Sequence, residues 1–309
     1  MKYSKNVICL LMADLIWGAA FVAQSTGGDM VGAYTFTCLR AFIACIALLP
    51  IIGYRSGRKG NTMQKMSMAE KKQLWLGGLA CGVALALATN FQQLGITMGA
   101  SVGKAGFLTA CYILLVPIFG LFLKKPCSWN IAVGVGLALV GLYFLCAQDT
   151  SLTLTAPDYL LLLCAVMFAI QILAIDYFAP QVDVVKLSWY EFLVCGIITL
   201  VPMWWVDMGH SVAGTLQWAM VFTDYRVWIP LLYAGVCSSG IAYTLQIAGQ
   251  KNFNPSIAAL LMSFESVFSL FFGWALLGEK LSSRELWGCL LIFGAVIIAQ
   301  IPVARKNRS

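Results

Sequence analysis

Long apolar runs, separated by short polar segments, fill almost the whole chain. A run of about 20 apolar residues is long enough to cross a bilayer as a helix. The pattern predicts ten such spans, whose ranges are 6–24, 34–54, 73–97, 101–124, 128–147, 158–178, 184–206, 228–249, 255–277 and 283–303. The sequence therefore predicts an all-α integral membrane protein. The longest connection, residues 55–72, is polar and basic, and we expect it to form a short amphipathic helix on the membrane surface.

Composition agrees with a membrane protein. Of the 309 residues, 61% are hydrophobic and 11% are charged, whereas soluble domains are about 45–50% apolar and about 25% charged. The net charge of +7 could indicate nucleic-acid binding, but the basic residues lie in the short segments between spans. We therefore expect no nucleic-acid partner and attribute the charge to membrane topology.

The distribution of Lys and Arg predicts the orientation of the chain, because cytoplasmic loops carry an excess of these residues. With the N-terminus inside, 15 of the 20 Lys and Arg residues lie on the inner side and four on the outer side. Both termini are therefore predicted to be cytoplasmic, in a protein of the cytoplasmic membrane. Arg40 lies within the second span, about six residues or ~9 Å from its outer end. We expect it to snorkel outward or to pair with a carboxylate, in a structural role.

Polar residues in the third and eighth spans repeat with one spacing. Each trio falls at i, i+3 and i+7, and the second trio lies 153 residues after the first: Asn90, Gln93 and Thr97, then Tyr243, Gln246 and Gln250. Other pairs of spans align at nearly the same offset. We infer two five-helix halves, residues 1–148 and 149–309. An odd number of spans per half inverts the second half, and inverted repeats are typical of secondary transporters with a site near the midplane.

The spacing also predicts a site. Residues three and four apart share one face of a helix, and amides facing lipid would be costly. Two interpretations stay open: these faces line a substrate cavity, or they form interhelical hydrogen bonds, worth ~0.6 kcal/mol on average in membranes. The candidate cavity residues, which include aromatic side chains able to stack on a planar substrate, are Trp17, Asn90, Gln93, Tyr112, Gln171, Tyr243 and Gln246.

Two carboxylates lie near the middle of apolar spans. Glu265 is the one ionisable residue between Pro255 and Leu277, and Asp14 lies at a similar depth in the first span. A charged carboxylate at the bilayer centre costs at least ~2.5–3.5 kcal/mol, and such residues mark ion pathways. Glu265 and Asp14 are therefore candidates for coupling transport to protons. The alternative for Glu265 is a neutral, hydrogen-bonded role in helix packing.

Four stretches form a series with characteristic order and spacing. They are IWGAAFVAQ (16–24), FTCLRAFIACIALLP (36–50), AGFLTACYILLVPIFGLFL (105–123) and SFESVFSLFFGWALLGEKLS (263–282), the last followed by Gly288. Through them the whole chain resembles the EamA-type transporters of the drug/metabolite transporter superfamily. The positions that match the family motifs are Trp17, Gly18, Arg40, Tyr112, Pro117 and Glu265. Ser266, where many relatives have proline, and Asp14, where most have a small or apolar residue, depart from them.

The resemblance implies ten helices in two inverted EamA repeats. It also implies a central cavity lined mainly by the first, third, fourth, sixth, eighth and ninth helices. Pro117 is expected to kink the fourth span, and its counterpart in the ninth is not proline. The two halves therefore need not move alike.

We expect a secondary transporter that exports or exchanges a small metabolite or drug-like molecule by alternating access. The alternatives are a passive facilitator or channel of the same fold and, less favoured, a membrane-embedded enzyme. The one histidine, His210, lies in an outer loop, and the 11 cysteines have the pattern of small buried hydrophobic residues. No cofactor or metal is expected. The identity of the substrate, the direction of transport, proton coupling and the choice between monomer and dimer stay open.

Overall fold

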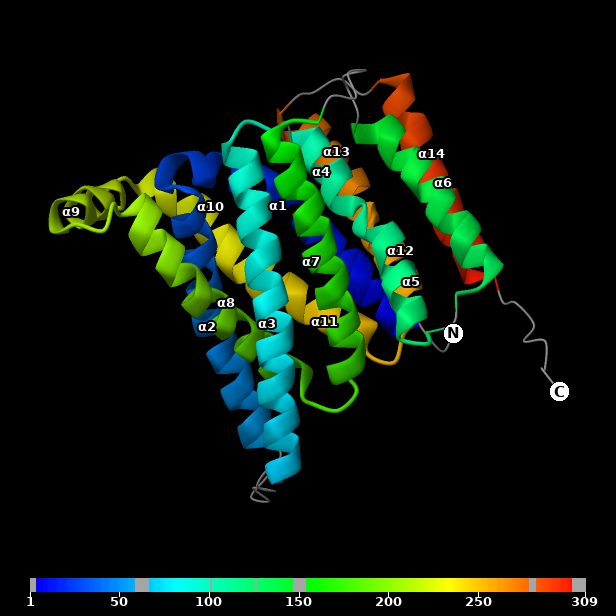
Figure 1. Ribbon diagram of the computed structural model, residues 1–309, viewed down its shortest axis with the longest axis horizontal. Helices are drawn as coiled ribbons and strands as arrows, with labels where there is room; N and C mark the ends of the chain where they lie inside the picture. The colour runs from blue at the N-terminus through cyan, green and yellow to red at the C-terminus, as the bar shows by residue number, and fades with distance from the viewer. Residues whose placement is uncertain are drawn as a thin grey trace.

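The computed structural model describes residues 4–58, 67–100, 102–125, 127–146, 154–277 and 282–301. In these ranges the regular elements are helices, with no strand (Figure 1). The α-helices are α1 (Ser4–Val31), α2 (Ala33–Arg58), α3 (Met68–Thr97), α4 (Val102–Ala110), α5 (Tyr112–Phe122), α6 (Trp129–Cys146), α7 (Ala156–Phe178), α8 (Val184–Pro202), α9 (Val212–Val221), α10 (Trp228–Leu232), α11 (Tyr243–Gln250), α12 (Pro255–Met262), α13 (Phe264–Leu277) and α14 (Ser283–Gln300). Segments η1 (Met203–Asp207) and η3 (Tyr233–Ala242) are π-helices, and η2 (Tyr225–Val227) is a 3-10 helix.

Eight segments within the described ranges are long and apolar enough to cross a membrane. They are Ser4–Val31, Ala33–Arg55, Met68–Thr97, Ala105–Phe122, Ala156–Phe178, Val184–Asp207, Tyr225–Gln250 and Pro255–Phe272. These segments coincide with the first four predicted spans and with the sixth to the ninth. The ranges predicted as the fifth and tenth spans form α6, with a shorter apolar stretch at Trp129–Phe144, and α14. The prediction of an all-helical protein that crosses the membrane several times is confirmed.

The connection between α2 and α3 differs from the expectation of a separate surface helix. α2 continues to Arg58 and α3 starts at Met68, so both ends of this connection belong to the long helices. Residues 59–66 lie outside the described ranges. A capping box starts α3: the Ser67 amide donates to the Glu70 carboxylate at 2.8 Å, and the Glu70 amide donates to Ser67 Oγ at 3.1 Å. Two amides that a helix start leaves unpaired are thereby satisfied.

The central helices pack around α1, α3, α7 and the η3–α11 segment. α3 lies against α7 and α8, α11 and η3 lie against α1, and η3 lies against α2. At one side of the bundle α6 packs along α14 (Figure 1). A Cβ on Gly18 would lie 2.8 Å from the backbone of Phe268 in α13, and a Cβ on Gly82 would lie 2.7 Å from the Glu191 carbonyl oxygen in α8. These glycines therefore set how closely the helices approach.

Two spans are interrupted near their middle. The fourth predicted span divides at Cys111 into α4 and α5, and the ninth divides at Ser263 into α12 and α13. Cys111 Sγ donates to the Phe107 carbonyl at 3.5 Å, and Ser263 Oγ donates to the Leu260 carbonyl at 2.6 Å. Side-chain bonds of this kind compete with the helix ladder and bend helices. Pro117 was expected to distort only the fourth span, but both spans are interrupted and neither interruption lies at the proline.

The eighth predicted span changes helix type along its length. It runs through α10, η3 and α11, and η3 is a π-helix of ten residues. In a π-helix the hydrogen bonds reach one residue further than in an α-helix, and such segments are rare and frequent at functional sites. The extra residue per turn changes which side chains of the following α11 face the bundle centre.

Candidate functional site

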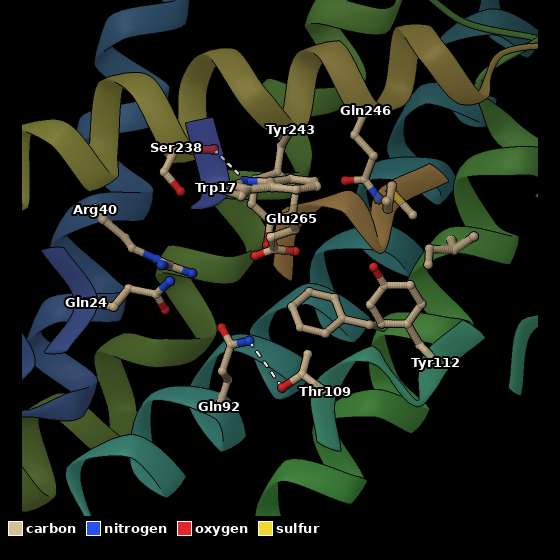
Figure 2. A pocket seen from close by; sticks show the side chains of 13 residues that line it. Trp17, Gln24, Arg40, Gln92, Thr109, Tyr112, Ser238, Tyr243, Gln246 and Glu265 are labelled. Carbon is tan, nitrogen blue, oxygen red and sulfur yellow. Dashed lines mark hydrogen bonds between the residues drawn. The ribbon is translucent and has the colours of Figure 1, made fainter. Parts of the chain in front are cut away.

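A cavity lies in the bundle where the two interrupted spans meet α1, α2, α3, α7 and the η3–α11 segment. Its volume is about 40 Å³, which is room for roughly three waters at about 10–15 Å³ each. The lining residues are Trp17, Gln24, Arg40, Gln92, Thr109, Tyr112, Phe168, Ile172, Ser238, Tyr243, Gln246, Met262 and Glu265 (Figure 2). Both halves of the chain therefore build the cavity.

Aromatic side chains form one wall of the cavity. The rings of Trp17 and Tyr243 meet edge to face with centroids 4.8 Å apart. The Trp17 indole N–H donates to the Ser238 carbonyl oxygen in η3 at 3.2 Å, which fixes the ring. Tyr112 on α5 lies with its ring centroid 6.3 Å from that of Phe168 on α7. The wall offers ring faces and edges to an apolar or planar group.

Glu265 is the one acid among the residues that line the cavity. It follows the Ser263 interruption at the start of α13 and points into the cavity (Figure 2). Its carboxylate makes no hydrogen bond and no ion pair with any residue that the structure describes. The Gly18 contact holds α13 directly against α1, so the position of Glu265 depends on that helix pair.

Asp14 lies on α1, one turn before Trp17. Its side chain is fully buried, and neither carboxylate oxygen has a hydrogen-bond partner among the described residues. It lies within electrostatic range of Glu265 but is not one of the lining residues. One acid therefore faces the cavity and the other is enclosed in the bundle.

The side of the cavity away from Gln246 carries Arg40 from α2, together with the amides of Gln24 and Gln92 (Figure 2). Arg40 is 4% exposed, and its guanidinium reaches the cavity. It neither snorkels to the membrane surface nor pairs with a carboxylate in the described part of the chain, which are the two contacts that were expected of it. Gln92 is anchored from α3 by a bond from its amide to Thr109 Oγ1 at 3.4 Å.

A chain of amides leads from the cavity to a buried acid. The Gln246 amide donates to Gln171 Oε1 at 3.2 Å, and the Gln171 amide donates to Glu191 Oε1 at 2.8 Å. Gln171 and Glu191 are fully buried, whereas Gln246 reaches the cavity. Gln171, which was predicted to belong to the lining, therefore supports Gln246 from behind.

The predicted polar face of the third span does not line the cavity. Asn90 turns toward α8 and donates to Thr199 Oγ1 at 2.8 Å. Gln93, which is 1% exposed, donates to the Gln24 carbonyl oxygen of α1 at 3.1 Å. Both amides are used in helix–helix hydrogen bonds, and it is Gln92 between them that faces the cavity.

Five of the predicted residues are brought together at the cavity: Trp17, Tyr112, Tyr243, Gln246 and Glu265. Eight further lining residues were not predicted: Gln24, Arg40, Gln92, Thr109, Phe168, Ile172, Ser238 and Met262. The position of Arg40 inside an apolar span was a usable signal, because a charge at that depth marks a polar environment. Nothing in the sequence pattern singles out Phe168, Ile172 or Met262 from other core residues.

The helix arrangement and the central cavity can be compared with known proteins. A model of the EamA-like transporter family matches residues 4–147 and residues 155–300. The chain belongs to this family. The family is part of the drug/metabolite transporter superfamily, so the resemblance seen in the sequence motifs is confirmed.

Relatives cover nearly the whole chain. A protein of Archaeoglobus fulgidus described as an uncharacterized transporter is 28% identical over 295 residues, which are 95% of this chain and 85% of the relative. The uncharacterized transporter YoaV of Bacillus subtilis is 22% identical over 312 residues, which are 98% of this chain and 99% of the relative. A solved crystal structure shares the fold over 99% of both chains, with a TM-score of 0.76 and 18% identity. The chain is a multi-pass membrane protein of a transporter family.

Proposed function

We propose that the protein is a secondary transporter that exports or exchanges a small metabolite or drug-like molecule across the cytoplasmic membrane by alternating access. The observation that carries this proposal is the buried cavity. Polar, aromatic and charged side chains from residues 17–112 and 168–265 converge on it. Ionisable side chains this deep in an apolar bundle are rare, and where they face a cavity they mark substrate or ion pathways.

Ten membrane crossings in two inverted halves, residues 1–148 and 149–309, are part of the proposal. Helix contacts support it because they occur in pairs that are related by exchanging the halves. By their order among the predicted spans, α1 corresponds to α7, α2 to α8, α3 to the η3–α11 segment, and α5 to α13. α3 packs on α7, and correspondingly α11 packs on α1. α3 also packs on α8 and η3 on α2, while α5 packs on α7 and α13 on α1. The spans interrupted at Cys111 and Ser263 form another such pair. The family model also matches once in each half.

Alternating access is supported by the size of the cavity. Small-molecule sites measure roughly 300–1,000 Å³, whereas this cavity measures about 40 Å³. A small-molecule solute therefore fits only when the surrounding helices move apart. Interrupted helices beside a midplane cavity are typical of transporters that rock between two open states. We assign the structure to a closed state of that cycle.

Within this cycle we assign substrate contact to Trp17, Tyr112, Tyr243 and Gln246, with Gln171 holding Gln246 in place. These four line the cavity from α1, α5 and α11. The two amides of the third span, Asn90 and Gln93, are assigned to helix packing because their hydrogen bonds are made to α8 and α1.

We assign proton coupling to Glu265, with Asp14 as the neighbouring acid. Glutamine keeps the shape and hydrogen bonding of a protonated glutamate, so Glu265→Gln should fold and bind substrate. It should lose accumulation driven by an imposed pH gradient in proteoliposomes, because it cannot release a proton. Accumulation that follows the gradient and persists unchanged in Glu265→Gln rejects Glu265 as the coupling group. A purely structural glutamate predicts damage from Ala and little from Gln.

The substrate can be found by thermal shift of the purified protein against a metabolite library, because a ligand of the native state raises its stability by mass action. The solute found is then tested in proteoliposomes. Accumulation against its own gradient, with an ion gradient imposed, supports a secondary transporter. Equilibration without accumulation under every ion gradient identifies the passive facilitator of the same fold instead.

The proposed topology can be tested with cysteines at exposed positions. Thr223, between α9 and η2, is assigned to the outside, and Gln181, between α7 and α8, to the cytoplasm. In a Cys127→Ser background, which removes an exposed native thiol, Thr223→Cys should react with an impermeant reagent in intact cells. Gln181→Cys should react only after permeabilisation. The reverse pattern overturns the orientation, and equal labelling overturns the inverted repeat.

A further inference from the structure

Two ionisable side chains line the cavity, Glu265 and Arg40, and the guanidinium of Arg40 is the one positive charge. Arg40 is 4% exposed, yet within the described ranges it has no ion pair and no side-chain hydrogen bond. A buried cation without a partner is unfavourable, because desolvation removes its water and nothing replaces the lost interactions. Since the guanidinium points into the cavity (Figure 2), its missing partner is a group that enters the cavity.

The surroundings of Arg40 are suited to an anion. Its neighbours at this side of the cavity are the neutral amides of Gln24 and Gln92, each with two N–H donors, of which Gln92 uses one on Thr109 (Figure 2). Glu265 lines the same cavity but forms no ion pair with Arg40. The guanidinium fork matches two oxygens of a carboxylate or a phosphate.

We propose that the transported solute is a small organic carboxylate whose carboxylate group binds Arg40 between Gln24 and Gln92. This inference rests on the proposed transport function, because it assigns a substrate class to that cavity. Arg40 is the one basic side chain of the lining, so the site offers a single positive charge. With Glu265 protonated, that charge balances a carboxylate, whereas a phosphate monoester with about two negative charges at neutral pH would remain uncompensated.

The remainder of the solute is placed by the opposite wall. Trp17, Tyr112 and Tyr243 present ring surfaces to the cavity, and Ile172 and Met262 add aliphatic surface. An apolar or aromatic body fits this wall. The apolar part of the solute is bound by burial of its surface, which is not specific for one shape. The carboxylate therefore supplies most of the discrimination between solutes.

The test is a binding measurement on the purified full-length protein with three matched pairs. The pairs are hexanoate and hexanamide, phenylacetate and phenylacetamide, and indole-3-acetate and indole-3-acetamide, with phenyl phosphate as a separate probe. At least one acid should raise the melting temperature and bind about tenfold or more tighter than its amide, because charge-assisted bonds to Arg are stronger than neutral ones. The proposal is overturned if no acid binds, if amides bind as tightly as acids, or if phenyl phosphate binds tighter than every acid.

Variants locate the effect. Arg40→Gln should remove the preference for acid over amide, and Arg40→Lys should retain part of it. Arg226→Gln, at an exposed site in η2, is the matched control and should bind like the wild type. Preference that survives in a folded Arg40→Gln protein overturns the assignment. If Arg40→Gln does not fold, the contrast between acid and amide in the wild type still decides the substrate class.

Failure of this inference is distinguishable from failure of the transport proposal. If the wild type and Arg40→Gln transport a neutral or cationic solute equally well, the transport proposal stands and the proposal of a carboxylate substrate is rejected. If acids bind through Arg40 but are not transported into proteoliposomes under any imposed gradient, the anion site stands and the transport proposal is rejected.

Discussion

α3 and the η3–α11 segment carry polar residues with the same spacing, yet they present different members of the series to the cavity. In α11 the lining residues are Tyr243 and Gln246, the first two of their trio. In α3 the trio begins at Asn90 and Gln93, and both turn to neighbouring helices while Gln92 takes the cavity position. Spacing predicted that each trio shares a face, but it did not predict which neighbour that face meets.

The difference amounts to one residue of register. Gln92 and Gln246 are related by an offset of 154, whereas the polar trios align at 153. One residue turns an α-helix by about 100°, since it has 3.6 residues per turn, which is enough to move an amide from the cavity to a helix interface. α3 is α-helical throughout, whereas α11 follows the π-helical η3. A change of winding of this kind is invisible to a comparison of spacings.

The largest effect is expected where η3 packs on α2. A Cβ on Gly235 would lie 2.5 Å from Ile43 Cγ2, so Gly235→Val must push η3 away from α2 and shift α11 with it. Overpacking of this kind costs about 1–3 kcal/mol, and we expect a lower melting temperature together with loss of transport. Gly136→Val is the control, because nothing lies within 4 Å of a Cβ there. Equal stability and transport in the two variants would show that η3 does not depend on this close approach.

A smaller effect is expected from removing single amides. Gln246→Leu should lower transport by about tenfold, because one lost hydrogen bond of ~1.4 kcal/mol corresponds to that factor. Gln93→Leu, the equivalent member of the α3 trio, should leave transport per folded molecule nearly unchanged. Uptake rates in proteoliposomes measure both. If the two variants lose transport equally, the polar face of α3 takes part in the cavity after all.

Accessibility sharpens the same comparison without removing function. Cysteine at Gln92 or Tyr243 should react with small hydrophilic reagents when the transporter cycles, and substrate should protect it. Cysteine at Asn90 or Gln93 should react far more slowly, at the rate of the buried native cysteines. Fast, protectable labelling at Asn90 would contradict the register in which Gln92 faces the cavity.

The smallest effect is expected at the α3–α8 interface. Asn90→Leu removes the hydrogen bond to Thr199, and interhelical bonds in membranes average ~0.6 kcal/mol. A double-mutant cycle with Thr199→Val measures this coupling through unfolding of the protein in micelles. A coupling energy near zero would show that the hydrogen bond to Thr199 does not determine the orientation of Asn90.

Much of the architecture could be predicted from the sequence, because the hydrophobicity of successive residues adds up along a span. Twenty consecutive apolar residues identify a span whatever surrounds them, and over its described residues each of the ten predicted ranges coincides with helical segments. The interruptions at Cys111 and Ser263 could not be predicted, because neither residue is a glycine or a proline. Each side chain bonds to a carbonyl of the preceding turn, but such bonds also occur in uninterrupted helices, as at Thr89 in α3. Arg40 was expected to reach the surface or a carboxylate but lines the cavity, because depth in a span does not determine which of these a side chain can reach.

The amide chain behind Gln246 has a direction. A glutamine amide donates from one end and accepts at the other, so Glu191, which accepts from Gln171, orients Gln171, and Gln171 then orients Gln246. The far end of the chain is the Gln246 carbonyl oxygen, which has no partner among the described residues. The cavity is therefore polarised, with a cationic donor at Arg40 and a carbonyl acceptor at Gln246. A solute with two unlike ends has one favourable way to lie in it, and a single buried acid outside the cavity decides which way that is.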